Sequence, residues 1–434
     1  MFVRLLAIAM LMLCASCETT NHDSIDKWMR TEKGTAKLKR TLSDESLDPD
    51  LSAHAAANLI KKGMDPDVRT TLEQMTPGHR TEVVAKLAPR LWEIARLENE
   101  MQMPNAAQVQ AKDALVMCRK FGDDKLKQQI EGYLIDWYCV ASYEGRAQVG
   151  AVTGSTAIRM IGPPAAKKLM SVVDSLVAAP GQQKQKNRIG DETLIALAAT
   201  GSADAVKYLL QTARMKTGDD TLPTRAMSAL YKAYVDPAGL FDLVDSQPLV
   251  PNLDTLVSIA KDDTMPGAAA DDAVKLIKVV GPPACIAPLV GMVGIPHSNP
   301  RFKYVAADSA LKCGGLKAVK DVVHALPDGA YQQEELMGGV VVDITQMQPR
   351  AQVLATLREL LSDKSRIGRW VAVEALAAMK STEDIPRLKA VSSGEKLVGY
   401  WGDQSGVDPK DRKQDPTLGQ RAKELADRLG QPPK

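Results

Sequence analysis

The feature that most constrains the fold of this chain is a pair of short helices predicted for residues 365–391. Apolar residues recur at four-residue intervals through the first of them, at Ile367, Val371, Ala375 and Met379. Other apolar side chains widen this face, so that much of the helix circumference is apolar. Such a helix requires neighbours on two sides. The pattern therefore predicts a stack of helices and not an isolated pair.

The same helix–turn–helix unit returns along the chain with a period near 33 residues. Residues 161–165 read IGPPA, and residues 280–284 read VGPPA. In both, glycine can end one helix in a left-handed conformation, and proline can open the next helix. Gly281 and Gly314 are 33 residues apart, as are Leu197 and Leu230. A fixed period of this length is typical of helical repeat proteins.

Several helical repeat families share this period, and their signature residues separate them. The set positions of tryptophan and tyrosine in tetratricopeptide repeats, and the Thr-Pro-Leu-His of ankyrin repeats, are not found. Residues 155–391 resemble the HEAT family, in the short form also seen in bilin-lyase-like HEAT proteins. This resemblance implies an all-α fold, a right-handed α-solenoid of HEAT-like helix pairs. The HEAT motifs are mostly packing rules, so they specify the fold far better than an activity.

Residues 1–17 are interpreted as a lipoprotein signal peptide. Arg4 supplies the positive charge, and the apolar run that follows is too short for a permanent membrane span. The segment ends in Cys14-Ala15-Ser16-Cys17, which resembles a bacterial lipobox with Cys17 as the acylated residue. The alternative is ordinary cleavage after Ser16, which would leave Cys17 as a free thiol.

The lipobox resemblance implies a protein anchored to a membrane by a lipid without spanning it. Glu18 follows Cys17, at the position where bacterial sorting uses aspartate to retain lipoproteins in the inner membrane. We therefore expect a location at the bacterial outer membrane, facing the periplasm. The rest of the chain is expected to comprise a polar tether (18–27), irregular N-terminal helical repeats (28–150), the HEAT-like array (151–391), an insertion loop (392–417) and a C-terminal capping helix (418–434).

The sequence offers little catalytic or ligand-binding chemistry. The five histidines show no metal-ligand spacing, and we predict neither a metal nor a cofactor. The segment 150–156 is rich in small residues but lacks the lysine of a phosphate-binding loop, and it is interpreted as a flexible turn. A formal net charge of +2 is too near neutral to indicate a nucleic-acid partner. These observations argue against an enzyme.

Four cysteines follow the signal peptide, at positions 118, 139, 285 and 313. Cys118 and Cys139 lie at heights that differ by roughly 20 Å in the predicted hairpin, so they cannot meet within it. Cys285 begins the second helix of one repeat and Cys313 ends the first helix of the next, which places both on one edge of the array. They are candidates for a disulfide. The alternative is a pair of small buried thiols.

The preferred function is a non-catalytic scaffold that binds another envelope protein or protein complex on a curved helical surface. The alternatives are a bilin-lyase-like enzyme or chaperone, implied by the HEAT resemblance, and a structural spacer of an envelope assembly. Tyr400 and Trp401, in the insertion, are a possible partner contact, because aromatic residues are scarce in this chain and often anchor interfaces. Alternatively, both rings fold back and cover the final helix.

Overall fold

The computed structural model describes residues 19–99, 102–178, 189–215, 221–330, 333–398, 400–401, 407–408 and 410–431. Over these residues the chain is helical, and its β-structure is limited to an isolated antiparallel bridge between Lys396 and Thr417. No described helix combines the length and apolarity needed to cross a bilayer. The predicted signal peptide, with Cys17, lies outside the described residues.

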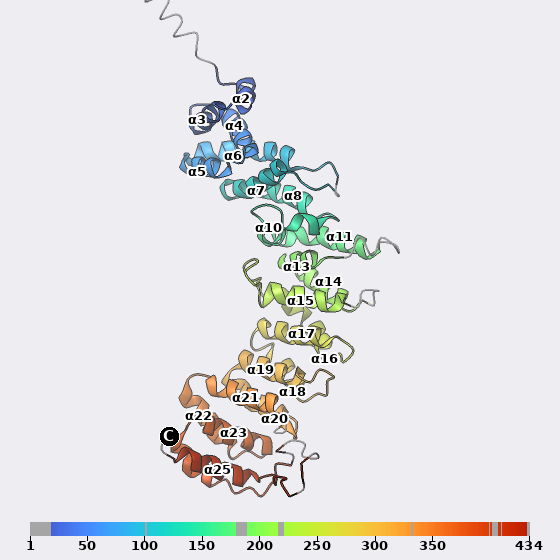
Figure 1. Cartoon of the computed structure of the whole chain (residues 1–434), viewed down its shortest axis with the longest axis vertical. Helices are drawn as coiled ribbons and strands as arrows, with labels where there is room; N and C mark the ends of the chain where they lie inside the picture. The colour runs from blue at the N-terminus through green and yellow to red at the C-terminus, as the bar shows by residue number, and fades with distance from the viewer. Residues whose placement is uncertain are drawn as a thin grey trace, which may run out of the picture. The chain divides into compact units, whose positions relative to one another are not determined.

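The chain divides into two compact units, most of whose helices are labelled in Figure 1. Unit 1 comprises residues 1–205 with 240–242, and unit 2 comprises residues 206–239 with 243–434. The helices of unit 1 are α2 (His22–Met29), α3 (Gly34–Ser43), α4 (Pro49–Lys61), α5 (Asp65–Gln74), α6 (Pro77–Ala95), α7 (Ala106–Phe121), α8 (Asp124–Tyr138), α9 (Tyr143–Ala147), α10 (Gly154–Ile161), η1 (Pro163–Ala165), α11 (Ala166–Ala178) and α13 (Asp191–Ala199). Helix α14 (Ala203–Thr212) spans the division between the units.

Unit 1 is built around α6, which packs between α4 and α7. Leu59, Leu87 and Leu115, one from each of these three helices, are fully buried. Pro89 lies inside α6. The described α-helices of unit 1 range from the five residues of α9 to the 19 residues of α6.

Unit 2 contains α15 (Leu222–Tyr234), η2 (Gln247–Asn252), α16 (Leu253–Lys261), α17 (Gly267–Val280), α18 (Ile286–Val293), α19 (Phe302–Gly314), α20 (Leu316–Ala325), α21 (Glu334–Gln346), α22 (Arg350–Leu360), α23 (Arg366–Ala378), η4 (Thr382–Asp384), α24 (Ile385–Lys389) and α25 (Leu418–Leu429). Helices α15, α17, α19, α21 and α23 pack one on the next, and α18, α20 and α22 form a second row (Figure 1). Two parallel rows of packed helices are the architecture of an α-solenoid. The prediction of an all-α solenoid is confirmed.

The two Gly-Pro-Pro turns use their glycines as predicted but differ in their prolines. Gly162 and Gly281 have φ of 79° and 85°, a conformation in which a side chain would be strained. Pro163 opens η1, which leads directly into α11. Pro282 does not open α18, which begins only at Ile286. The prediction is wrong there because residues 281–285 form a turn of their own, closed by the Cys285 N–H donating to the Gly281 carbonyl at 3.2 Å.

The polar tether predicted for residues 18–27 is also corrected, because α2 begins at His22. The side chain of Asn21 accepts a hydrogen bond from the Ser24 N–H, and the Ser24 hydroxyl accepts one from the Asn21 N–H, each at 2.9 Å. This reciprocal cap satisfies two N–H groups at the helix start. Ile25 and Trp28 are buried, so the segment packs as a helix despite its polar composition.

Candidate functional site

The insertion at residues 392–417 is held at its base by backbone hydrogen bonds. The Leu397 N–H donates to the Pro416 carbonyl, and the Leu418 N–H donates to the Glu395 carbonyl, both at 3.0 Å. Leu397 is fully buried, and Thr417 caps α25 through the Gln420 N–H. Helix α25 packs against α23 and α24. The two ends of the insertion are therefore fixed on the last helices of unit 2.

The two aromatic residues of the insertion have different environments. Tyr400 is half-buried, and its ring lies 5.6 Å from the Arg421 guanidinium of α25, which pairs with Glu374 of α23 at 2.7 Å. Burial raises the pKa of the Tyr400 hydroxyl. Trp401 is 44% exposed, and it packs edge-on against Tyr400 at 4.9 Å between ring centroids. Tyr400 folds back on α25, as in the alternative in which the rings cover the final helix. Trp401 faces solvent, as in the alternative of a partner contact.

Polar contacts orient the exposed Trp401 ring. Its Nε1–H donates to the Gln414 carbonyl at 3.2 Å, and the Lys413 ammonium lies 4.4 Å from the ring centroid. Two further apolar side chains of the insertion are exposed, Val398 at 60% and Val407 at 38%. We call Val398, Trp401 and Val407 the insertion surface. Each of these three apolar side chains is accessible to another molecule.

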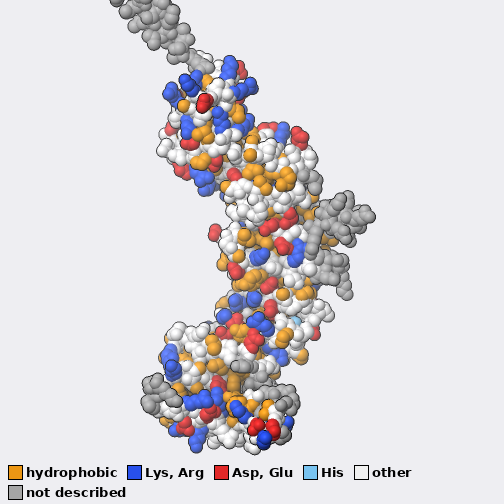
Figure 2. Space-filling model, viewed as in Figure 1, with side chains coloured by type: hydrophobic (Ala, Val, Ile, Leu, Met, Phe, Trp, Pro, Cys, Tyr) orange, Lys and Arg blue, Asp and Glu red, His pale blue; other side chains and the backbone are white. Residues whose placement is uncertain are grey.

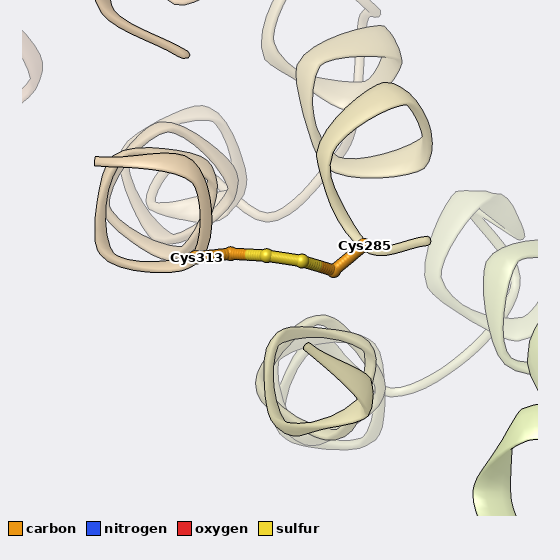
Figure 3. The surroundings of a disulfide bond; sticks show 2 residues. All are labelled: Cys285 and Cys313. Carbon is orange, nitrogen blue, oxygen red and sulfur yellow. A yellow bond between two sulfur atoms is a disulfide. The ribbon is translucent and has the colours of Figure 1, made fainter. Parts of the chain in front are cut away.

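Cys285 and Cys313 are brought together in unit 2 and joined by a disulfide (Figure 3). Cys285 precedes α18 and Cys313 lies in the last turn of α19, and their Cα atoms are 6.6 Å apart. Cys118 and Cys139 are free and buried, and burial raises the pKa of each thiol to about 12. A thiol with so high a pKa is a poor nucleophile at neutral pH. These two cysteines are packing residues.

Unit 1 contains a cavity of about 370 Å³. One wall carries Trp92, whose ring stacks on Tyr133 with centroids 4.9 Å apart, and another carries Trp137, whose Nε1–H donates to the Ala95 carbonyl. The charged residues that line the cavity are Arg96, Glu98, Asp136, Arg146 and Lys168. Trp137 and Arg146 are only 1% and 2% exposed, so Trp92, Arg96 and Lys168 are the aromatic and basic side chains open to a ligand, beside the acidic Glu98 and Asp136. Sequence reasoning missed this cavity because its walls come from three separate segments of the chain.

A buried lysine holds the loop that precedes α10. Lys112 is fully buried, and its ammonium donates to Asp113 Oδ1 at 2.6 Å and to the carbonyls of Val149 and Val152 at 2.9 and 2.8 Å. Asp113 in turn accepts from the Ala151 and Val152 N–H groups. The interpretation of this segment as a flexible turn is therefore wrong. A Lys–Asp pair nearly 40 residues away in the sequence holds its backbone in place.

Two of the histidines meet in unit 1. The Nδ1 atoms of His22 and His54 are 2.9 Å apart. The Nε2 atoms of the same rings face carboxylates, His54 toward Asp26 at 2.9 Å and His22 toward Asp50 at 3.3 Å. Each ring thus has a carboxylate at its Nε2 atom and the other ring at its Nδ1 atom.

Among the described residues, no group of three or more histidine, cysteine or acidic side chains is placed to hold a metal ion. No family model matches the chain, and no curated protein matches it. Among solved structures, human deoxyhypusine hydroxylase in complex with glycerol is similar at 13% identity and a TM-score of 0.24. The match covers 69% of this chain and 98% of that one. A likeness this weak gives no basis for assigning an activity.

Proposed function

We propose that this protein is a non-catalytic lipoprotein of the bacterial outer membrane that binds another envelope protein on its periplasmic side. The lipobox-like end of the signal peptide supports a lipid anchor at Cys17. The solenoid supports a binding role, because stacked helix pairs present extended surfaces to protein partners. The observation that carries the proposal is the exposed, oriented Trp401 of the insertion surface.

An exposed tryptophan held in one orientation is well suited to anchor an interface. Tryptophan supplies a large apolar area at a small entropy cost and is enriched among the residues that dominate binding energy. Here Tyr400 supports one edge of the Trp401 ring, and the Gln414 carbonyl fixes its N–H. The base of the insertion is fixed on α25. We therefore propose that Trp401 contacts the partner and that Tyr400 supports the Trp401 ring.

This division of roles is tested by two separate substitutions. We expect Trp401→Ala to remove crosslinks to the partner in intact membranes, read by mass spectrometry, without lowering the Tm. Tyr400→Ala should lower the Tm, because its half-buried ring packs on Arg421. The matched control is Val250→Ala, which changes an apolar residue of unit 2 that is 42% exposed outside the insertion. Crosslinks that survive in Trp401→Ala would remove the basis of the proposal.

The anchor is tested independently by metabolic labelling with palmitate. The wild-type protein should carry the label, and Cys17→Ser should be unlabelled and should accumulate as unprocessed or soluble protein. Unlabelled wild-type protein would show that Cys17 is not acylated. In that case the crosslinking experiment would still test whether Trp401 binds a partner.

The cavity of unit 1 favours a second candidate function, a bilin-lyase-like enzyme. The Trp92 ring, with Arg96 and Lys168 in the same lining, suits a conjugated chromophore with carboxylate groups. Protein purified from its native membranes should then carry visible absorbance, and Trp92→Ala should remove it. Colourless wild-type protein, with intrinsic fluorescence that an added bilin does not quench, would exclude this candidate. A spacer without a specific partner would give no specific crosslinks in the first experiment.

A further inference from the structure

The first two helices of unit 1 present a row of positive charges to solvent. Figure 2 shows lysine and arginine side chains gathered at the end of unit 1 that α2 and α3 form. The row begins in the last turn of α2 and continues along α3. Its members are all exposed, and we call them the basic stripe: Lys27, Arg30, Lys33, Lys37 and Arg40.

The stripe lies along one face of α3. Lys33, Lys37 and Arg40 are separated by four and three residues, which places them above one another on a helix surface. The opposite face carries Leu38 and Leu42, which are buried. Helix α3 therefore rests on unit 1 by its apolar face and turns its cations outward.

Four of the five cations of the stripe have no acidic partner among the described residues, and the fifth, Lys37, lies 5.0 Å from the centroid of the Trp28 ring. Lys27, Arg30, Lys33 and Arg40 form no ion pair with a described residue, whereas Lys39, on the flank of α3, pairs with Asp67 at 2.9 Å. Glu32 is the single acidic residue between positions 27 and 40. Like charges four residues apart, as at Lys33 and Lys37, destabilise a helix slightly. Ion pairing within the folded chain therefore does not explain the positions of Lys27, Arg30, Lys33 and Arg40.

The stripe begins close to the proposed lipid. Helix α2 starts five residues after Cys17, a distance of at most about 18 Å for an extended chain. With Cys17 acylated, the first helices are held next to the phospholipid headgroups. A row of lysine and arginine at that place matches anionic headgroups in charge.

We propose that the basic stripe binds anionic phospholipid headgroups such as phosphatidylglycerol. This inference rests on the proposed function for the placement of the stripe near a membrane. The lipid fixes where the chain is attached, and the stripe fixes which face of α3 meets the surface. The two contacts together orient the first helices on the membrane, a task that a flexible acyl attachment alone does not perform.

The test uses unlipidated chain beginning at residue 18, which keeps every described residue. Flotation with phosphatidylcholine vesicles is compared with flotation with vesicles that also contain phosphatidylglycerol. We expect binding only to the anionic vesicles, weakened by added salt. Lys33→Ala with Lys37→Ala should weaken binding by about fivefold for each cation removed. The matched control, Lys125→Ala with Lys127→Ala on α8, removes the same charge away from the stripe and should bind as wild type.

Three outcomes would overturn the proposal. These are absence of binding, equal binding to neutral vesicles, and an equal loss in the α8 control, which would indicate a nonspecific effect of net charge. Because the tested chain carries no lipid, its result does not depend on acylation of Cys17. Failure of palmitate labelling and failure of vesicle binding are therefore distinguishable.

Discussion

Replacing Lys112 by methionine is expected to destabilise unit 1 by about 2–5 kcal/mol. Methionine keeps most of the apolar stem but removes the ammonium. The fully buried ammonium now pairs with Asp113 and donates to the carbonyls of Val149 and Val152. The substitution therefore tests whether one buried cation holds the loop before α10.

The magnitude follows from the partners that remain. The Val152 carbonyl keeps a donor, because the Tyr138 hydroxyl donates to it at 2.7 Å. The part-buried Val149 carbonyl loses its lysine donor, and since a buried unsatisfied acceptor costs about 1–3 kcal/mol, this loss contributes about 1 kcal/mol. Asp113, 18% exposed, loses its cation but keeps two N–H donors, which adds a cost of similar size.

Urea unfolding followed by circular dichroism measures the change, and hydrogen exchange of residues 149–153 assigns it to unit 1. The control is Lys127→Met, because Lys127 is partly exposed and its ion-pair partner among the described residues is the exposed Asp124, at 3.3 Å. We expect that control to change stability by no more than about 0.5 kcal/mol. If Lys112→Met is no more destabilising than Lys127→Met, the reasoning about the buried cation is refuted.

Three further predictions concern other parts of the molecule. Leu376→Ala should cost about 2–5 kcal/mol in urea unfolding, because Leu376 is fully buried, whereas Val342→Ala, at a 49% exposed position, should cost little; equal effects would contradict the packing of α23. Cys285 and Cys313 should resist alkylation in denaturant until a reductant is added, whereas Cys118 and Cys139 should react at once, as mass spectrometry can check. Burial lowers the pKa of His54, so the folded state favours the neutral ring and the unfolded chain takes up a proton first. Protection of α2 amides from hydrogen exchange should therefore be complete above the ordinary histidine pKa of about 6.5. It should fall as the pH drops through the lowered pKa of His54. In His54→Gln this dependence should disappear, whereas it should persist in the control His324→Gln.

The fold could be predicted because it depends on local, repeated patterns. Residues such as Val371 and Ala375 follow the helical period, and Gly162 and Gly281 mark turns that only glycine adopts without strain. The predicted proximity of Cys285 and Cys313 follows from the same repeat, because equivalent ends of neighbouring helices lie on one edge. The helix that begins at His22 was not predicted, because its composition is polar. Its start is marked by the reciprocal hydrogen bonds of Asn21 and Ser24, two short polar side chains.

The candidate sites depend on contacts that no local pattern contains. The sequence is compatible with either burial or exposure of Tyr400 and Trp401. In the folded chain Arg421, which pairs with Glu374, covers the Tyr400 ring, whereas Trp401 is 44% exposed. His22 and His54 meet across 32 residues because α2 folds onto α4. The walls of the unit 1 cavity come from helices that are adjacent only after folding.

The sequence by itself therefore determined the all-α fold class, the helix pairs and the N-terminal segment that suggests a lipid anchor. These features reside in periodicity and in short motifs, which act over a few residues. Only the tertiary structure decided that the loop before α10 is held by Lys112, that one aromatic ring of the insertion is exposed, and that the cations of α3 share one outward face while Lys39 is paired. These outcomes depend on which surfaces remain after the helices have packed, because burial and charge pairing are set by partners distant in the chain.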